Sequence, residues 1–424
     1  MEKEEKRRVR VNEDNPSIQR IESRCLKCGL CMNTCENTVG IDHAYEKEDY
    51  ALCINCGQCV MNCPTGALLA KYDYKKVLNL VNDTDTLVSL SFAPAIRSTL
   101  GEEFSIDSNL EGILPSIGRA LGFDYVFDIT FGADVTVMEE ANELVDRLNK
   151  KTNLPMFTSC CPSWVKYACM FHPELIPNIS TTKSPIGIQS SLIKTYFKEF
   201  NNIEKEIISV VVAPCTSKKY EILTGDTDYI ITTQELAMML RECKIDINAL
   251  KPSIFDPLLS KGSKSGVMFG RSGGVMEAVL SYTHYLLTGK APKMDEYHIE
   301  LNDSTFTTSY KIGNKIIRAL VVYGMPSLER VLKDKDEYDI IEVMNCPGGC
   351  IGGGGQPLIP IQKLKDATAK REDYLNNEDA KAKYCYENEE IIELYKAYLG
   401  KPMSAKAELL LHQNHKDLSF LIKK

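Results

Sequence analysis

Sixteen cysteines are the residues of this 424-residue chain best suited to chemistry, and thirteen of them fall into four short segments. Eight lie near the N-terminus, in two copies of the pattern C-x2-C-x2-C-x3-C. The charged N-terminal residues lack the apolar stretch of a secretion signal, so we expect reduced thiols and not a disulfide framework. Clustered cysteines in such a chain bind metal or carry out redox chemistry.

The spacing of the paired repeat suits 4Fe–4S cubes, because two-residue gaps let one loop cover three corners of a cube. In bacterial ferredoxins the fourth cysteine of each run binds the other cluster. The repeat therefore predicts one cube on Cys25, Cys28, Cys31 and Cys63, and a second on Cys35, Cys53, Cys56 and Cys59. A pair of zinc knuckles is the alternative, although zinc sites rarely use this spacing.

Five further cysteines lie in three segments that are far apart in the chain. The segments read TSCCPSW from Thr158, PCTSKKYE from Pro214 and EVMNCPGGCIGGGGQP from Glu342. We expect four loop cysteines from three distant segments to come together only where they bind a common group, and iron is the natural candidate. The glycine run lets the backbone approach that object closely. A phosphate-binding loop is the alternative for the run, although no Lys-Ser or Lys-Thr pair follows it.

These three segments resemble the signature motifs of the iron-only (FeFe) hydrogenases, and with the cysteine repeat the resemblance spans most of the chain. It implies an enzyme that reversibly reduces protons to molecular hydrogen, with electrons from ferredoxin or a similar carrier. It also implies a two-iron subsite with carbon monoxide, cyanide and azadithiolate ligands, installed by maturation proteins. A third cube would be bound by Cys161, Cys215, Cys346 and Cys350, and Cys350 would bridge to the two-iron subsite.

The resemblance assigns further residues to the surroundings of this cofactor. Lys218 would donate to a cyanide ligand, whereas we expect Lys219 to be a solvated surface lysine. Apolar or backbone contacts to the cofactor would come from Ala93, Pro94, Phe269 and Met344. For Phe269 and Met344 an ordinary core position is equally compatible. Three positions depart from the family pattern: Ser163, Ile186 and Ala213.

A proton route to a buried metal is also implied. Cys160 resembles the family's non-ligating cysteine that passes a proton to the azadithiolate. Glu140, Glu143 and Arg147 recur at helical spacing on one face, and Ser180 is expected to bridge Cys160 to Glu140. A solvated helix with a charged stripe is the alternative. The remaining cysteines, which belong to no motif, are predicted to be small buried hydrophobes: Cys169, Cys243 and Cys385.

Strands alternating with helices must position these loops. We predict strands at 87–92, 125–129, 206–212, 229–232, 319–323 and 338–343, and helices at 135–150, 234–243 and 327–333. Cysteines follow three strand ends, and such an alternation indicates mainly parallel sheets with a site at their carboxyl ends. Residues 363–424 look helical and carry no chemistry that we can identify.

The expected organisation is an α+β two-cluster ferredoxin-like domain over residues 1–80 and a larger α/β catalytic domain over 81–424. The resemblance implies two lobes in the larger domain, with the active site between them. A net charge of −8 gives no reason to expect nucleic acid. The apolar runs are too short to cross a membrane, so we expect a cytoplasmic protein. A hydrogen sensor and an iron–sulfur assembly protein that retains only cube clusters are the alternative functions.

Overall fold

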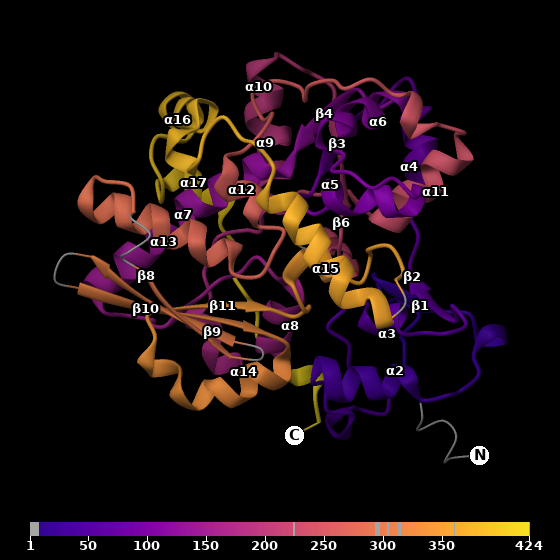
Figure 1. Cartoon of the computed structure of the whole chain (residues 1–424), viewed down its shortest axis with the longest axis horizontal. Helices are drawn as coiled ribbons and strands as arrows, with labels where there is room; N and C mark the ends of the chain where they lie inside the picture. Colours follow the sequence, from indigo (N-terminus) through magenta and orange to yellow (C-terminus); the bar gives the residue numbers. More distant parts are fainter. Residues whose placement is uncertain are drawn as a thin grey trace.

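The computed structural model describes residues 8–223, 225–292, 297–302, 305–312, 315–359 and 361–423. Within these ranges the strands form a two-stranded, a four-stranded and a five-stranded sheet, with helices packed around the two larger ones (Figure 1). No helix in the described ranges is both long and apolar enough to span a lipid bilayer.

The N-terminal unit is built around the cysteine repeat. Strand β1 (Ile18–Arg20) pairs antiparallel with β2 (Leu68–Ala70), and the two cysteine runs lie between them in sequence. Short helices α2 (Leu30–Asn33) and α3 (Gln58–Met61) each follow a glycine with positive φ, +85° at Gly29 and +72° at Gly57. Glycine adopts this left-handed conformation without steric cost, so the two runs repeat in backbone as well as in sequence.

The four-stranded sheet is parallel throughout, as predicted. Its strand order is β4 (Tyr125–Asp128), β3 (Leu87–Phe92), β6 (Ile207–Ala213) and β7 (Tyr229–Thr232). Strands β3 and β7 have the predicted bounds. This part of the chain also contains α4 (Tyr74–Val81), α5 (Ile96–Thr99), α6 (Leu114–Ala120) and α11 (Thr233–Glu242).

The five-stranded sheet is mixed, although parallel pairings outnumber antiparallel ones across the two larger sheets, as predicted. Its order is β5 (Met156–Phe157), β11 (Ile340–Met344), β10 (Lys315–Tyr323), β9 (Thr305–Ile312) and β8 (Tyr297–Asn302). The first three strands are parallel, but β9 and β8 are antiparallel to their neighbours. Only two residues separate β8 from β9 and β9 from β10, a connection that suits antiparallel strands and is too short for a parallel crossover.

Helix α7 (Ile129–Lys150) begins six residues earlier than predicted. The β-branched and aromatic residues after Asp128 look like a continuing strand, but the Asp128 carboxylate accepts a hydrogen bond from the Thr130 amide at 3.0 Å and caps a helix there. Helix α7 packs against α9 (Pro185–Leu192), α12 (Lys264–Met268) and α13 (Gly274–Thr288). Helices α8 (Pro162–Phe171) and α14 (Met325–Val331) contact the β11 and β10 strands of the five-stranded sheet.

The C-terminal segment is helical, as predicted. It contains α15 (Ile361–Asn376), α16 (Glu389–Leu394) and α17 (Ala405–Leu411). Helix α16 contacts α7 and α17 contacts α9 (Figure 1), whereas residues 419–421 near the end of the chain contact α8.

Candidate functional site

The eight N-terminal cysteines line two separate hollows. One hollow is lined by Cys25, Cys28, Cys31 and Cys63 among others, and the other by Cys35, Cys53, Cys56 and Cys59. Each hollow receives the fourth cysteine of the other run, which is the crossed grouping that the repeat predicts. In the described ranges no three His, Cys, Asp or Glu side chains gather tightly enough for one metal ion. A 4Fe–4S cube spreads four thiolates over four irons.

Four further cysteines lie in loops after strands of both large sheets. Cys215 follows β6 of the four-stranded sheet, whereas Cys161 follows β5 and Cys346 follows β11 of the other. Burial and then repulsion by Cys161 raise the pKa of Cys350 to about 11. Burial also raises the pKa of Cys215 and Cys346, and repulsion among these thiols adds to it, so the four lie close together. Four thiols from three loops, of which Cys346 is buried and the others are partly buried, fit an iron–sulfur cluster, which would bind them as thiolates and displace their protons.

The glycine run after Cys350 packs against backbone and does not form a phosphate cradle. The Gly355 amide donates to the Pro214 carbonyl at 2.9 Å, and the Gly353 amide donates to the Cys350 backbone carbonyl at 3.1 Å. A Cβ at Gly353 would lie 2.4 Å from the Pro214 oxygen. Glycine is therefore required for the close approach of two cysteine loops, and these two amides already have acceptors.

Lys218 is buried beside the adjacent cysteines. Its Nζ donates to the Cys160 carbonyl at 2.9 Å and to Glu221 Oε1 at 2.8 Å. The expectation for Lys219 is wrong: its side chain is fully buried and donates to the Ile230 carbonyl at 2.7 Å and to Glu235. The helical turn after Cys215 directs Lys219 towards β7, where it supports the sheet.

The other residues assigned to the cofactor surroundings are all buried, in two different apolar clusters. Ala93, Ala213 and Ile186 pack with the four-stranded sheet, whereas Phe269 and Met344 pack in the cluster that contains Cys160. Pro94 is buried at the end of β3. Ser163 is also buried, and its hydroxyl has no hydrogen-bond partner among the described residues.

The acidic face of α7 is buried, so the interpretation as a solvated charged stripe is wrong. Glu140 is inaccessible, and Glu143 and Arg147 are at most 7% exposed. Arg147 Nη2 donates to Glu143 Oε1 at 2.6 Å and to the Ile179 carbonyl at 3.0 Å. A buried carboxylate held by a guanidinium and further donors is satisfied without water.

Ser180 occupies a different place from the predicted one. Its hydroxyl donates to Glu143 Oε2 at 2.7 Å and also interacts with Glu140, so it lies between the two carboxyl groups. The hydroxyl on the cysteine side of Glu140 belongs to Ser159, whose amide and Oγ contact Glu140 Oε1 at 3.2 and 3.3 Å. Sequence reasoning missed Ser159, although it directly precedes Cys160.

The Cys160 thiol is buried, and its pKa is raised by burial and then by the nearby carboxyl groups of Glu140 and Glu342. Glu140 Oε2 has no hydrogen-bond partner among the described residues. The series leading away from the cysteine loop therefore consists of the Cys160 thiol, the Glu140 carboxyl group, the Ser180 hydroxyl and the Glu143 carboxyl group. Such a series of exchangeable groups can pass a proton between the loop and Glu143.

The C-terminal segment, in which we identified no chemistry, supplies polar groups to the same region. His415 Nε2 lies 2.8 Å from the Ser180 carbonyl, and His412 Nδ1 lies 2.8 Å from Thr181 Oγ1. His412 also contacts Glu139 at 3.1 Å. These contacts join positions more than 200 residues apart, so no local spacing could have revealed them.

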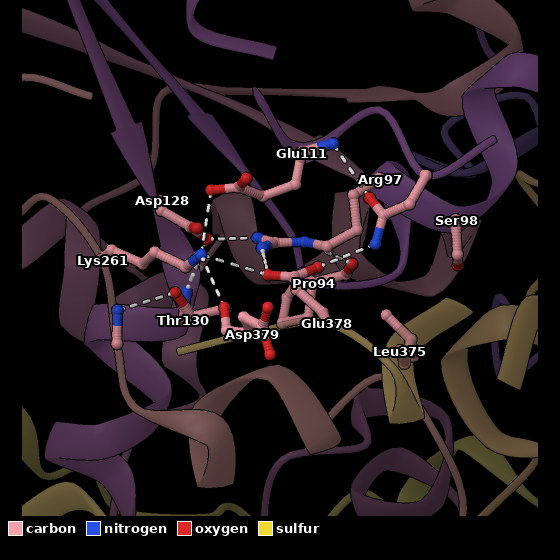
Figure 2. Close-up of polar contacts among 12 residues, drawn as sticks. Pro94, Arg97, Ser98, Glu111, Asp128, Thr130, Lys261, Leu375, Glu378 and Asp379 are labelled. Atoms are coloured by element: carbon pink, nitrogen blue, oxygen red, sulfur yellow. Dashed lines mark hydrogen bonds and ion pairs between the residues drawn. The ribbon is translucent and has the colours of Figure 1, made fainter. Parts of the chain in front are cut away.

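A buried arginine that sequence reasoning also missed fixes the backbone at Pro94. Figure 2 shows the fully buried Arg97 between Pro94, Asp128 and Glu378. Its Nε donates to the Pro94 carbonyl at 3.0 Å. Its Nη1 donates to the Glu378 carboxylate and its Nη2 to the Asp128 carboxylate, each at 2.6 Å. Lys261 lies 3.4 Å from Glu378 in the same group. Arg97 thereby ties the C-terminal segment to the carboxyl ends of β3 and β4.

The carboxyl group of Glu140 makes stability depend on pH. Burial raises its pKa to about 8 from 4.5, opposed by the hydrogen bond from Ser159. The folded state therefore holds an extra proton between these values, and stability falls as pH rises through that window, by up to about 1.4 kcal/mol per pH unit. Glu140→Gln should flatten this fall, measured as the free energy of unfolding by urea at successive pH values. Exposed Glu174→Gln is the control; an unchanged slope in Glu140→Gln would contradict the prediction.

The three cysteines outside the motifs differ from one another. Cys169 and Cys385 are buried, as predicted, but Cys243 is exposed at the end of α11, which corrects that expectation. Cys243 follows the last turn of this helix, where the chain leaves the core.

Comparisons with known proteins agree with this arrangement. Residues 86–354 match the model of the iron-only hydrogenase large subunit, C-terminal domain, and 365–418 match the iron hydrogenase small subunit. Residues 22–38 and 47–69 match 4Fe–4S binding domains. These matches establish that the chain carries iron–sulfur binding domains of the ferredoxin type ahead of a hydrogenase-type region.

Relatives of two kinds were found. The NADP-reducing hydrogenase subunit HndD of Solidesulfovibrio fructosivorans is 36% identical, over 94% of this chain and 74% of the relative. A cytosolic Fe–S cluster assembly factor, narfl of Xenopus tropicalis, is 28% identical, over 89% of this chain and 86% of the relative. The structure of a variant of the FeFe-hydrogenase HydA1 from Chlamydomonas reinhardtii matches with a TM-score of 0.72 and 30% identity, over 82% of this chain and 99% of the other. The chain therefore belongs to the iron-only hydrogenase family.

Proposed function

We propose that this protein is an active iron-only hydrogenase, which reversibly reduces protons to molecular hydrogen with electrons from ferredoxin or a similar carrier. The observation that carries the proposal is the buried series from Cys160 through Glu140 and Ser180 to Glu143. A cluster scaffold has no need to deliver protons to its interior, whereas proton reduction requires it.

The proposed cofactors are three 4Fe–4S cubes and a two-iron subsite with carbon monoxide, cyanide and azadithiolate ligands. When bound, the two-iron subsite supplies the site at which protons and electrons combine. The two N-terminal hollows would each hold one cube, on the cysteines that line them. Cys161, Cys215, Cys346 and Cys350 would hold the third, and Cys350 would also help to hold the two-iron subsite. Its surroundings are Ala93, Pro94, Ile186, Ala213, Phe269 and Met344.

The protein's own residues orient the ligands and move the proton. Lys218, held by the Cys160 carbonyl and Glu221, presents a buried cation to an anionic cyanide. Cys160 exchanges a proton with Glu140, and Ser180 connects Glu140 to Glu143. Arg147 orients Glu143 at 2.6 Å and keeps its carboxylate in contact with Ser180.

The domain organisation proposed with this function is a ferredoxin-like domain over residues 1–80 and a catalytic domain over 81–424. The active site lies between two lobes, one on each large sheet, because cysteine loops from both sheets supply its ligands.

Infrared spectroscopy of protein matured with the two-iron subsite tests the function. Bands of metal-bound carbon monoxide and cyanide, together with hydrogen evolution from a reduced mediator, are expected. Bands without turnover would instead indicate a hydrogen sensor.

An iron–sulfur assembly role is the second candidate, because the Xenopus tropicalis assembly factor aligns with 89% of this chain. That role predicts iron in the cubes alone. Absence of the carbon monoxide and cyanide bands after maturation, with the cubes intact, would favour it over the hydrogenase.

A further inference from the structure

The loop that carries Cys56 makes direct contact with the catalytic cysteine loops. Thr216 Oγ1 donates to the Asn55 carbonyl at 2.8 Å. A Cβ at Gly354 would lie 2.4 Å from the Cys56 carbonyl oxygen, so the two backbones touch there. Such contact requires glycine and leaves no room for water between the loops.

Gln58 sends its side-chain amide across this contact. It lies between Cys56 and Cys59 in sequence and is 8% exposed. Its Nε2 is 3.2 Å from Cys346 Sγ and 3.2 Å from the Gly352 carbonyl oxygen. The carbonyl only accepts, and an iron-bound thiolate also only accepts. The NH₂ end of the amide, which has two N–H donors, must therefore face both.

Asn345 supplies a second amide from the catalytic loop. Its side chain is 3% exposed, and its Nδ2 lies 3.8 Å from the sulfur of its neighbour Cys346. The Cys346 sulfur therefore faces two amides, one from each loop.

We propose that Gln58 and Asn345 form an amide bridge to Cys346 that raises the reduction potential of the catalytic cube. The proposal rests on the proposed function, in which Cys346 is a ligand of this cube. Hydrogen bonds to cluster sulfurs help to set cluster potentials. An N–H donor stabilises the reduced cube, which carries one more negative charge, and so raises the potential. When one electron passes between the cubes, one is oxidised and the other reduced, and no bond changes.

A potentiometric titration followed by EPR tests the bridge in the full chain loaded with 4Fe–4S cubes and not matured. Cys215→Ala, which removes a ligand of the catalytic cube, assigns the signals. Gln58→Met keeps the side-chain length without a donor, and Gln58→Glu keeps the shape but only accepts. The catalytic-cube potential should fall in the order wild type, Gln58→Met, Gln58→Glu. Asn345→Leu should also lower the catalytic-cube potential, but by less, because its contact to Cys346 is longer.

Asn62→Leu is the matched control, because that residue directly follows the same helix, but its amide donates to the Gln58 carbonyl at 2.9 Å and not to sulfur. It should leave the catalytic-cube potential unchanged. Equal catalytic-cube potentials in wild type and both Gln58 variants would overturn the bridge.

A measurement on the wild type needs no substitution. Pulsed EPR in D₂O should detect an exchangeable deuteron coupled to the reduced catalytic cube, and its absence would also overturn the bridge. Because these experiments use unmatured protein, they can fail while the infrared test succeeds, or succeed while it fails.

Discussion

Replacing Cys160 by serine is expected to lower hydrogen turnover by at least about 100-fold, the lower end of what a positioned acid–base group contributes. Serine keeps the size of the side chain and the backbone carbonyl that accepts from Lys218. However, a hydroxyl is a far weaker acid than a thiol and cannot hand on a proton at the same rate. The carbon monoxide and cyanide bands of matured protein should therefore persist while hydrogen evolution is lost.

Cys169→Ser is the matched control, because Cys169 is another buried thiol on the neighbouring helix α8 and belongs to no motif. Its turnover should stay within a few-fold of wild type. Normal turnover in Cys160→Ser would remove Cys160 from the proton route. Loss of the infrared bands would instead show that Cys160 is needed to hold the cofactor.

Replacing Arg97 by methionine is expected to destabilise the fold by about 3–5 kcal/mol, the cost of leaving a buried charge without its partner. Asp128 and Glu378 would lose their common guanidinium, and the Pro94 carbonyl would lose its donor. The unpaired Asp128 carboxylate should contribute most of this loss of stability, because it is fully buried. Urea unfolding of the cluster-loaded protein, followed by circular dichroism, measures the loss.

Two comparisons make this test specific. Arg119→Met removes a partly exposed pair with Asp256 and should cost no more than about 1 kcal/mol. Asp128→Asn combined with Arg97→Met should recover part of the stability, because the stranded charge is then absent. Equal destabilisation by Arg97→Met and Arg119→Met would show that the buried group contributes no more than a surface pair.

The proton series and the buried arginine differ in how far the sequence could reveal them. Glu140, Glu143 and Arg147 share one helix, so their spacing of three and four residues was sufficient to place them on one face. Their burial depended on Ser159 and on residues 178–181, which contact these three side chains from other parts of the chain. Arg97 sits in a short helix after β3, and its partners lie 31 and 281 residues away.

By itself the sequence determined the cysteine groups, the family and the strands at 87–92 and 229–232. Each of these depends on residues that are close in the chain or on a spacing that the chemistry imposes. Only the tertiary structure decided that Ser180 lies between the two glutamates, that Lys219 supports the sheet and that β8 and β9 run antiparallel. It also decided that the amide of Gln58 reaches Cys346 of the opposite loop. A side chain's partner across the fold is set by which elements pack together, and that choice is made by the whole core and not by any local pattern.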